Sequence, residues 1–307
     1  MSRYPFMAAA NRFLDSYFGV YSEGMYEELL RRYPKIQKQL ITLTSLGKIS
    51  TTDPKNLTSG DIKEYVIAQK ARGIKEVSIS HDLSAIKNLC LYVNGNNCVD
   101  VAKTQFPILF IKKRHVRLPV VEKPEFNEIC GFINTISPNA PERMFRAAAI
   151  VGLSFGTGPR TAELLHAKIR FLDPDLRFIF YDHVKGMNTY GEKRTVPIRP
   201  EVTPALKNYL KTRCSDSEFL FPNSKGGPFV SQSFRTAKEM IVEGSGVCFD
   251  FRTARRTYAQ YLIDEGFPLE EVSIILGHSD TKTTERSYGR PRNDRVVRKV
   301  IDHWSQK

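Results

Sequence analysis

Apolar residues recur at helical spacing through the N-terminal third of the chain. A capping sequence at residues 58–61 precedes one such pattern, which a glycine ends. A second helix is expected to open at Ser78 or Ser80 and to close at Gly95. Residues 1–50 also have helical character without clear boundaries. Because strand signals are scarce here, the pattern predicts a small helical domain.

Beyond Pro124 the pattern changes from helix to strand and back. Apolar residues at helical spacing follow Pro124, and residues 147–153 form an apolar run that predicts a helix crossing the core. Residues 177–185 alternate and are rich in aromatic and β-branched side chains, which predicts a strand, and residues 194–198 are its expected partner. The segments expected to be helical after this hairpin are residues 204–210 and 231–242.

Two further helices are expected near the C-terminus, with a tight corner after the second. The first carries apolar residues at helical spacing over residues 254–262. Pro268 suits the first position of the second helix, and Gly277 is a good stop. His278 is therefore expected in a corner between helices, and a polar residue after it can cap the next helix, which carries Tyr288 near its end.

The 307-residue chain is strongly basic, with 46 Lys and Arg against 33 Asp and Glu and a formal net charge of +13. The length suggests two domains, and the charge favours a polyanion such as a phosphate backbone, although a basic composition alone is weak evidence. A basic run between Pro107 and Pro119 fits a linker lying on DNA and equally a solvated linker; it contains Lys112, Lys113, Arg114, His115 and Arg117.

Cysteine usage and hydropathy predict the compartment. The five cysteines are scattered without the short spacing of a zinc site, which favours free thiols in a reducing compartment. No signal peptide is recognised, and the longest apolar run, residues 147–155, is too short to span a bilayer. We therefore expect a cytoplasmic protein, associated with DNA, that makes no membrane contact.

Several residues of the C-terminal half have a chemical use at a phosphodiester. Arg160 follows a proline and is expected in the first turn of a helix, where unpaired N–H groups favour an anion. Glu163, three residues on, can hold its guanidinium. Arg252 and Arg255 lie three residues apart and can make forked bonds to phosphate oxygens, and Tyr288 can act as a nucleophile.

These residues carry a family resemblance. The stretch RRTYA at residues 255–259, followed by LGHSDTKTTERSY at residues 276–288, resembles the C-terminal catalytic block of the tyrosine recombinases, which include the phage integrases and Xer-like enzymes. The 23-residue interval from Arg255 to His278 matches the family's usual spacing. The ordered set is specific because it spans most of residues 155–290, whereas the N-terminal half carries almost no motif.

The resemblance implies a fold and a domain order. The fold class is mainly α with a small antiparallel β-sheet in the catalytic domain, arranged as a two-domain DNA clamp. Residues 1–111 would be a helical, SAM-like core-DNA-binding domain, residues 112–123 a basic linker, and residues 124–307 the catalytic domain with its C-terminal helix. In that linker Lys112, Lys113, Arg114 and Arg117 are the expected DNA-binding residues.

The resemblance also implies roles in strand cleavage through a 3′-phosphotyrosine. Tyr288 would be the nucleophile, and Lys185, or with less support Lys193, the acid for the departing 5′-oxygen. His278 would bond the phosphate or orient the tyrosine. The phosphate would be held by Arg160, Arg252 and Arg255, with Glu163 supporting them. No metal or other cofactor is required by this set, and no metal-ligand spacing is found.

Two positions depart from the family pattern. Arg252 stands where histidine is most frequent, and arginine cannot accept the tyrosine proton, so that role passes to another group or to water. Tyr288 lies ten residues past His278, where nine is commoner, and Ser287 occupies the usual position. The shift fits either a local bulge or a different delivery of the tyrosine, including delivery to a partner's active site.

The expected partner is double-stranded DNA with a specific core site, on which the protein would assemble as a tetramer. Asn293 can cap a helix over residues 293–307 whose apolar face fits packing on its own domain and docking in trans on a neighbouring subunit; the face comprises Val296, Val297, Val300, Ile301 and Trp304. A type IB topoisomerase-like nicking-closing enzyme and a catalytically impaired DNA-binding protein are the alternative functions.

Overall fold

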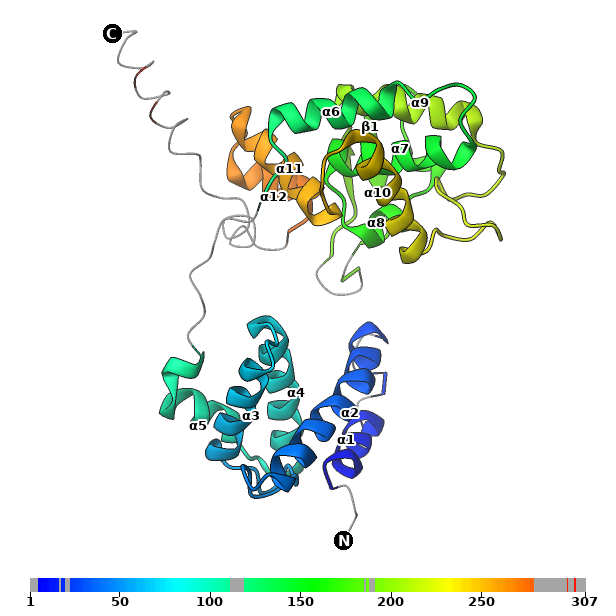
Figure 1. The fold of residues 1–307 in the computed structure, drawn as a ribbon. Helices are drawn as coiled ribbons and strands as arrows, with labels where there is room; N and C mark the ends of the chain where they lie inside the picture. The colour runs from blue at the N-terminus through cyan, green and yellow to red at the C-terminus, as the bar shows by residue number, and fades with distance from the viewer. Residues whose placement is uncertain are drawn as a thin grey trace. The chain divides into compact units, whose positions relative to one another are not determined.

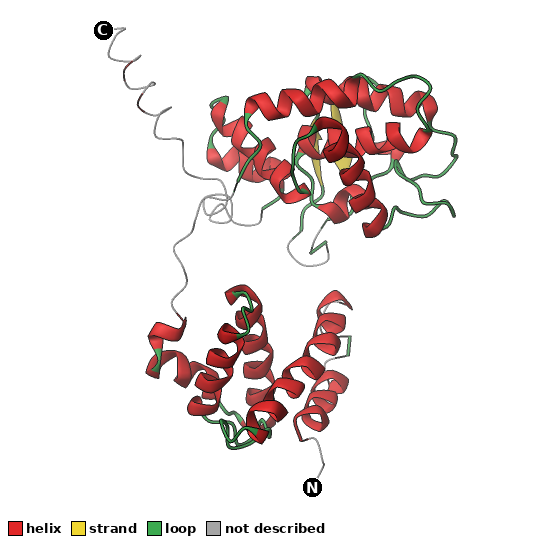
Figure 2. Ribbon diagram, viewed as in Figure 1, coloured by secondary structure: helices red, strands yellow, loops and turns green. Residues whose placement is uncertain are grey.

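The computed structural model of the chain describes residues 5–16, 18–19, 23–110, 119–184, 186–187, 191–278, 297 and 301. The chain divides into two units, Met1–Arg114 (unit 1) and His115–Lys307 (unit 2), and each has its own hydrophobic core. The described elements are helices and one pair of antiparallel strands, with a few isolated β-bridges besides (Figure 2). The predicted fold class, mainly α with a small antiparallel sheet, is therefore confirmed.

Unit 1 is a bundle of helices (Figure 1). Aromatic side chains form the centre of its core. Phe6, Phe13, Tyr33 and Tyr65 are buried at its centre because the apolar faces of the amphipathic helices converge there. Its elements are α1 (Pro5–Ser16), α2 (Glu23–Ser45), α3 (Ser59–Ala71), α4 (Glu76–Asn94), α5 (Cys98–Gln105) and a 3₁₀ turn, η1 (Pro107–Phe110).

In unit 1 the observed start of α3 agrees with the capping sequence, whereas the observed start of α4 differs from the predicted one. Thr58 caps α3 through a reciprocal pair, since Asp61 N donates to Thr58 Oγ1 at 3.2 Å and Thr58 N donates to Asp61 Oδ2 at 2.8 Å. Helix α4 ends where predicted, at Gly95 with φ +62°. It begins at Glu76 rather than at Ser78 or Ser80, because an acidic first turn starts this helix without a side-chain cap.

In unit 2 the helices surround one buried helix, α7 (Glu142–Thr157). Every residue from 147 to 157 is buried, which confirms the predicted core-crossing helix, and α9, α10 and α11 pack against it. The other helical elements are α6 (Lys123–Asn134), α8 (Thr161–Leu165), η2 (Ile169–Phe171), η3 (Pro200–Val202), α9 (Thr203–Thr212), α10 (Ser231–Ser245), α11 (Phe251–Asp264) and α12 (Leu269–Leu276).

The two strands are β1 (Phe178–Tyr181) and β2 (Arg194–Pro197). Their register pairs Phe178 with Pro197 and Tyr181 with Arg194. The predicted first strand, residues 177–185, is too long. After Tyr181 the side chains turn to other partners: Asp182 approaches Lys168 to 3.7 Å, and His183 stacks on His166 with ring centroids 3.9 Å apart.

The end of the predicted linker is part of unit 2. Val121 N donates to Thr257 Oγ1 at 2.9 Å, and Arg256 Nε donates to the carbonyl of Pro119 at 2.8 Å, so both residues are held on α11. Helix α6 begins at Lys123, inside the range predicted as linker. Residues 112–118 of the predicted linker, with Lys112, Lys113, Arg114 and Arg117, lie outside the described residues.

The described residues also bear on the predictions for the termini and cysteines. Of residues 293–307 only Val297 and Ile301 are described; both are helical, with exposed fractions of 46% and 52%. All five cysteines are free thiols, as predicted. Across the described ranges, no helix is both long and apolar enough to cross a membrane.

Candidate active site

Four segments of unit 2 meet at one buried carboxylate. They are the α7–α8 connection, the first turns of α11, the C-terminal end of α12 and the first residue of β2. The carboxylate is Glu163 on α8, which has no solvent exposure. Because a buried charge is tolerated only with partners, its surroundings define the site.

Glu163 is shared by three arginines. Its Oε1 accepts from Arg160 Nη1 at 2.9 Å, both oxygens accept from Arg194, and Oε2 lies 3.9 Å from Arg255 Nη1. Burial alone would raise the pKa of Glu163, but the hydrogen bonds and charge of Arg194 outweigh it, helped by the Arg160 backbone N–H and the Arg255 charge. The pKa of Glu163 therefore lies below its ordinary value, and the group is ionised at neutral pH.

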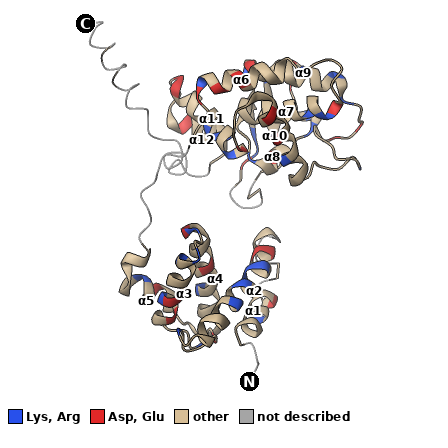
Figure 3. Ribbon diagram, in the orientation of Figure 1, with Lys and Arg blue, Asp and Glu red and all other residues tan. Residues whose placement is uncertain are grey.

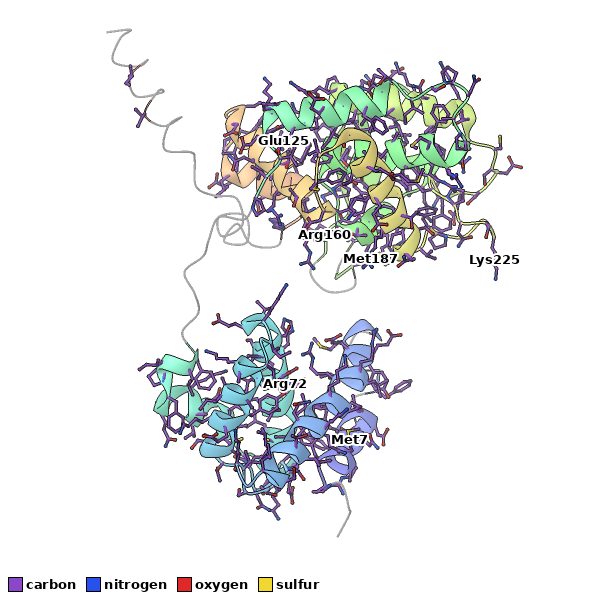
Figure 4. The ribbon with its side chains drawn as sticks, in the orientation of Figure 1. Met7, Arg72, Glu125, Arg160, Met187 and Lys225 are labelled. Carbon is purple, nitrogen blue, oxygen red and sulfur yellow. The ribbon has the colours of Figure 1, made fainter. Side chains whose placement is uncertain are left out.

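Arg160 is the most exposed of the three arginines, with 27% of its side chain accessible (Figure 4). Its backbone N–H donates to Glu163 Oε2 at 2.7 Å, and its Nη2 donates to the carbonyl of Gly277 at 2.9 Å. Arg160 is the N-cap of α8 with extended backbone angles, not a first-turn residue as predicted. The helix begins only at Thr161, because the Glu163 carboxylate holds the backbone N–H of Arg160 as in a capping box.

Arg255 reaches from α11 across the site. Its Nη1 donates to the carbonyl of Gly158 and its Nη2 to that of Leu276, both at 2.7 Å, and Nη2 also lies 3.1 Å from His278 Nε2. The structure thus brings Arg160, Arg255 and His278 together at one place. Position 158 requires glycine, because its φ is +57° and a Cβ there would lie 2.7 Å from Cδ1 of Tyr258.

His278 is neutral at physiological pH in this arrangement. Burial lowers its pKa first, and the charges of Arg255, Arg160 and Arg194 lower it further, to about 4. Since a guanidinium can only donate, Nε2 must accept from Arg255, and the ring proton is therefore on Nδ1. The imidazole is a hydrogen-bonding group here rather than a further positive charge.

Arg194 is a residue that the sequence pattern places only on a strand, without a role in the site. It is 8% exposed, and Nη1 and Nη2 form a fork on the two oxygens of Glu163 at 3.0 and 2.7 Å. The sequence held a signal for this role, because residues two apart on a strand face the same side and Arg194 lies two before the apolar Val196. The structure shows the alternation, with Arg194 and Val196 both buried. A charge on the core side of a strand implies a buried partner.

The site has an excess of positive charge. Three guanidinium groups surround one carboxylate while His278 is neutral, which leaves a net charge of +2 within this cluster. A phosphodiester carries one negative charge, and a pentacoordinate phosphorus with five oxygen ligands carries two. The cluster therefore matches the charge that develops during phosphoryl transfer better than the charge of the ground state.

Arg252 is held differently from Arg255. It lies on the same helix but is exposed, and within the described ranges no hydrogen bond or ion pair joins its side chain to Glu163 or His278. Its position one turn before Arg255 puts it at the rim of the cluster.

Two predicted site residues, Tyr288 and Lys185, lie outside the described residues. Lys193 is described and exposed, immediately before Arg194. No group of three or more His, Cys, Asp or Glu side chains in the described part of the chain is placed to hold a metal ion.

The sequence profile described as the phage integrase family matches residues 120–295. The chain is 26% identical over 282 residues to tyrosine recombinase XerC of Neisseria meningitidis serogroup B, which covers 89% of both chains. It is 29% identical to tyrosine recombinase XerA of Pyrococcus furiosus over 148 residues, covering 47% of this chain and 50% of that protein.

Solved structures share the fold. The Tn1549 transposon integrase in complex with circular intermediate DNA superposes with a TM-score of 0.70 at 18% identity, covering 95% of this chain and 98% of the other. A lambda integrase tetramer bound to a Holliday junction superposes with a TM-score of 0.64 at 13% identity, covering 94% and 79%.

Proposed function

Because the chain belongs to the phage integrase family and is a site-specific tyrosine recombinase, we propose that the cluster around Glu163 binds the scissile phosphate and that Tyr288 attacks it. The observation that carries this proposal is that Arg160 and Arg255 converge on the Glu163 carboxylate while His278 lies against Arg255.

Cleavage would proceed by direct displacement at phosphorus. The Tyr288 oxygen forms a bond to phosphorus while the bond from phosphorus to the departing 5′-oxygen breaks, and the DNA is held as a 3′-phosphotyrosine. Lys185 supplies a proton to the departing oxygen. The tyrosine proton passes to another group or to water, because Arg252 cannot accept it. The same steps in reverse, with a 5′-hydroxyl from another strand, rejoin the DNA.

The arginines would divide the work according to their exposure. Arg160, at 27% exposure, and the rim residue Arg252 can reach the non-bridging oxygens. Arg255 has 9% of its side chain accessible and supports the site through the carbonyls of Gly158 and Leu276 while presenting its charge to the phosphate. Losing one such donor typically costs on the order of 100- to 1,000-fold in rate.

We further propose that unit 1 binds the DNA backbone through a basic groove. The groove, of about 720 Å³, lies between α2, α3 and α4. Its exposed cations include Arg31, Lys35 and Lys38, which share one face of α2 at helical spacing. Figure 3 shows basic residues along α2, and Arg72, which is labelled in Figure 4, follows the last residue of α3. The acids in the groove, Glu28 and Asp82, are already paired with Arg32.

Assembly on DNA belongs to the same proposal. A lambda integrase tetramer on a Holliday junction shares the fold, which supports a tetramer acting on a specific core site, with the linker residues Lys112, Lys113, Arg114 and Arg117 on the DNA backbone. The segment over residues 293–307 would dock in trans on a neighbouring subunit, because its apolar residues recur at helical spacing along one face.

The test is covalent capture. Wild-type protein is incubated with a pool of nicked duplexes whose central region is randomised, and denaturant-resistant complexes are isolated and sequenced. We expect capture of a recurring core sequence by the wild type and none by Tyr288→Phe. Tyr92→Phe, a conservative change in unit 1, is the control and should capture DNA normally.

Covalent capture of DNA by Tyr288→Phe would refute the assignment of the nucleophile. So would a wild-type protein that captures no DNA. The relatives named above are recombinases and integrases, so a topoisomerase-like activity is not favoured; relaxation of supercoiled DNA without any core site would support that alternative. Salt-dependent binding without nicking would support an impaired DNA-binding protein.

A further inference from the structure

Arg194 links three parts of the site without being exposed to it. Its fork holds both oxygens of Glu163, and its Nε donates to the carbonyl of Ile275, near the C-terminal end of α12, at 2.8 Å. It lies at the first position of β2, so it also fixes the strand that follows the hairpin loop. One side chain therefore ties β2 to α8 and α12.

Each of these ties ends beside a residue that the proposed reaction uses. Glu163 holds Arg160 through the Oε1 bond at 2.9 Å and through the backbone bond at 2.7 Å. The α12 terminus is followed at once by Gly277 and His278, and Arg160 Nη2 donates to the carbonyl of Gly277. A shift of Arg194 would therefore move the phosphate-binding guanidinium and the histidine together.

Burial and bonding separate Arg194 from Arg160, the most exposed arginine of the cluster. Arg194 is 8% exposed, against 27% for the side chain of Arg160, and its Nε, Nη1 and Nη2 all donate to protein groups. The Tyr181 ring lies against its guanidinium, with 5.8 Å from the guanidinium carbon to the ring centroid. The side chain is thus enclosed by protein on several sides.

We propose that Arg194 is a positioning residue for strand cleavage: acting through Glu163 and the end of α12, it sets the placement of Arg160 and His278. This inference rests on the proposed function of the cluster. It adds a residue, 31 positions from Glu163 in sequence, that would act through protein groups rather than by binding the phosphate itself.

The charge of Arg194 has a second effect, which gives a readout independent of DNA. It helps to keep Glu163 ionised, and after burial, Arg255 and Arg160 it is a further cause of the lowered pKa of His278. Removing the charge should raise the pKa of His278, whereas an arginine that serves only to stabilise the fold would leave that pKa unchanged.

The experiment compares Arg194→Met, Arg194→Lys and the control Arg213→Met. Arg213 serves as the control because it is a partly buried arginine of unit 2 that bonds loop carbonyls, those of Ser217 and Phe219, but is not in the Glu163 cluster. Each folded variant is titrated by NMR of labelled histidine without DNA, and its cleavage rate and DNA affinity are measured on the duplex captured by wild type.

We expect Arg194→Met to raise the pKa of His278 and to slow cleavage roughly 100-fold, the loss that a displacement of about 1 Å can cause. DNA affinity should be unchanged, which separates positioning from binding. Arg194→Lys keeps the charge but cannot form the fork, so it should leave the pKa low and still slow cleavage. Arg213→Met should change neither quantity, even if it lowers the melting temperature.

Coupling gives the decisive comparison. If Arg194 acts through Glu163, Arg194→Met should slow cleavage much less in a Glu163→Gln background than in wild type. If the losses of cleavage rate from Arg194→Met and Glu163→Gln were additive, the proposal would be overturned. A folded Arg194→Lys that cleaves at the wild-type rate would also overturn it. Should Arg194→Met not fold, Arg194→Lys provides the test. If wild type captures no DNA, the proposed function fails, and the His278 titration alone decides whether Arg194 is coupled to the histidine.

Discussion

At the scale of single residues, the site is an arrangement of charges around Glu163. The carboxylate neutralises one of three guanidinium groups, and His278 stays uncharged because burial and those same guanidinium groups oppose its protonation. An incoming phosphate reverses that balance, since a negative charge nearby favours the imidazolium form. Substrate binding and protonation of His278 are therefore linked.

The linkage predicts proton uptake on DNA binding under mildly acidic conditions. The pKa of His278 is about 4 in the folded protein, below its ordinary value of 6.5, and phosphate should raise it. Titration calorimetry near pH 5 in two buffers of different ionisation heat should show net uptake by wild type. In His278→Gln this uptake should disappear, and equal uptake by both proteins would contradict the assignment.

The same shift fixes the sign of a stability effect. Between pH 4 and 6.5 the unfolded chain binds more protons at this position than the folded protein. The contribution of a neutral His278 to stability is therefore fully present above pH 6.5 and is lost as the pH falls toward 4.

The sequence predicted most of the residues of this cluster, because Arg160, Glu163, Arg255 and His278 stand in an ordered motif. It did not predict Arg194. The alternation along β2 marks a charge on the core side, but its partner, Glu163, is 31 positions away and belongs to another element. Only the packing of α8 against the strand brings the two together.

At the scale of elements, the corner after α12 depends on a glycine. Gly277 has φ +66°, and a Cβ on it would lie 2.8 Å from Arg194 Nη1. The left-handed backbone there serves to end α12, and the missing side chain leaves room for the guanidinium. The start of α4 and the end of β1 were harder to predict from the sequence, because neither is marked by a side-chain cap or by a residue that interrupts the element.

Gly277→Ala should therefore impair both folding and cleavage. The left-handed conformation costs about 1–2 kcal/mol for a residue with a Cβ, and the added methyl group displaces Arg194 as well. Denaturant unfolding and the covalent-capture assay measure the two effects.

Gly246→Ala is the matched control. Gly246 ends α10 with φ +71°, but nothing lies within 4 Å of its Cβ position. It should lose a similar stability and keep its cleavage activity. Equal loss of cleavage by both variants would show that the contact with Arg194 does not matter.

At the scale of the whole molecule, two units with separate cores would share one DNA substrate. The net charge of +13 is distributed over both, and the groove of unit 1 places several cations at one face of α2. Composition predicted a polyanion partner, and hydrophobic patterning predicted two regions. The patterning could not predict that Pro119 and Val121 pack on α11, because those contacts join residues more than a hundred positions apart.

The groove predicts a salt-dependent contribution to DNA binding. Replacing Lys35 and Lys38 with Gln should lower the slope of log affinity against log salt by roughly 1.8, about 0.9 for each phosphate that is no longer neutralised. Fluorescence anisotropy over a series of KCl concentrations measures the slope. The control variant replaces Lys207 and Lys211, which share α9 in unit 2. A slope that falls equally in both variants would refute the groove as a specific DNA-binding surface.

The close approach of Arg194 to Gly277 also has an evolutionary consequence. Two independent demands, one on backbone handedness and one on space, act on the same position. Most substitutions at Gly277 would violate both demands. Asparagine tolerates the left-handed backbone and would violate only the demand for space beside Arg194. A smaller residue at position 194 would make room for Gly277→Asn but would also lose the fork on Glu163, so no single change at Arg194 should restore cleavage to that variant, and both positions should resist substitution.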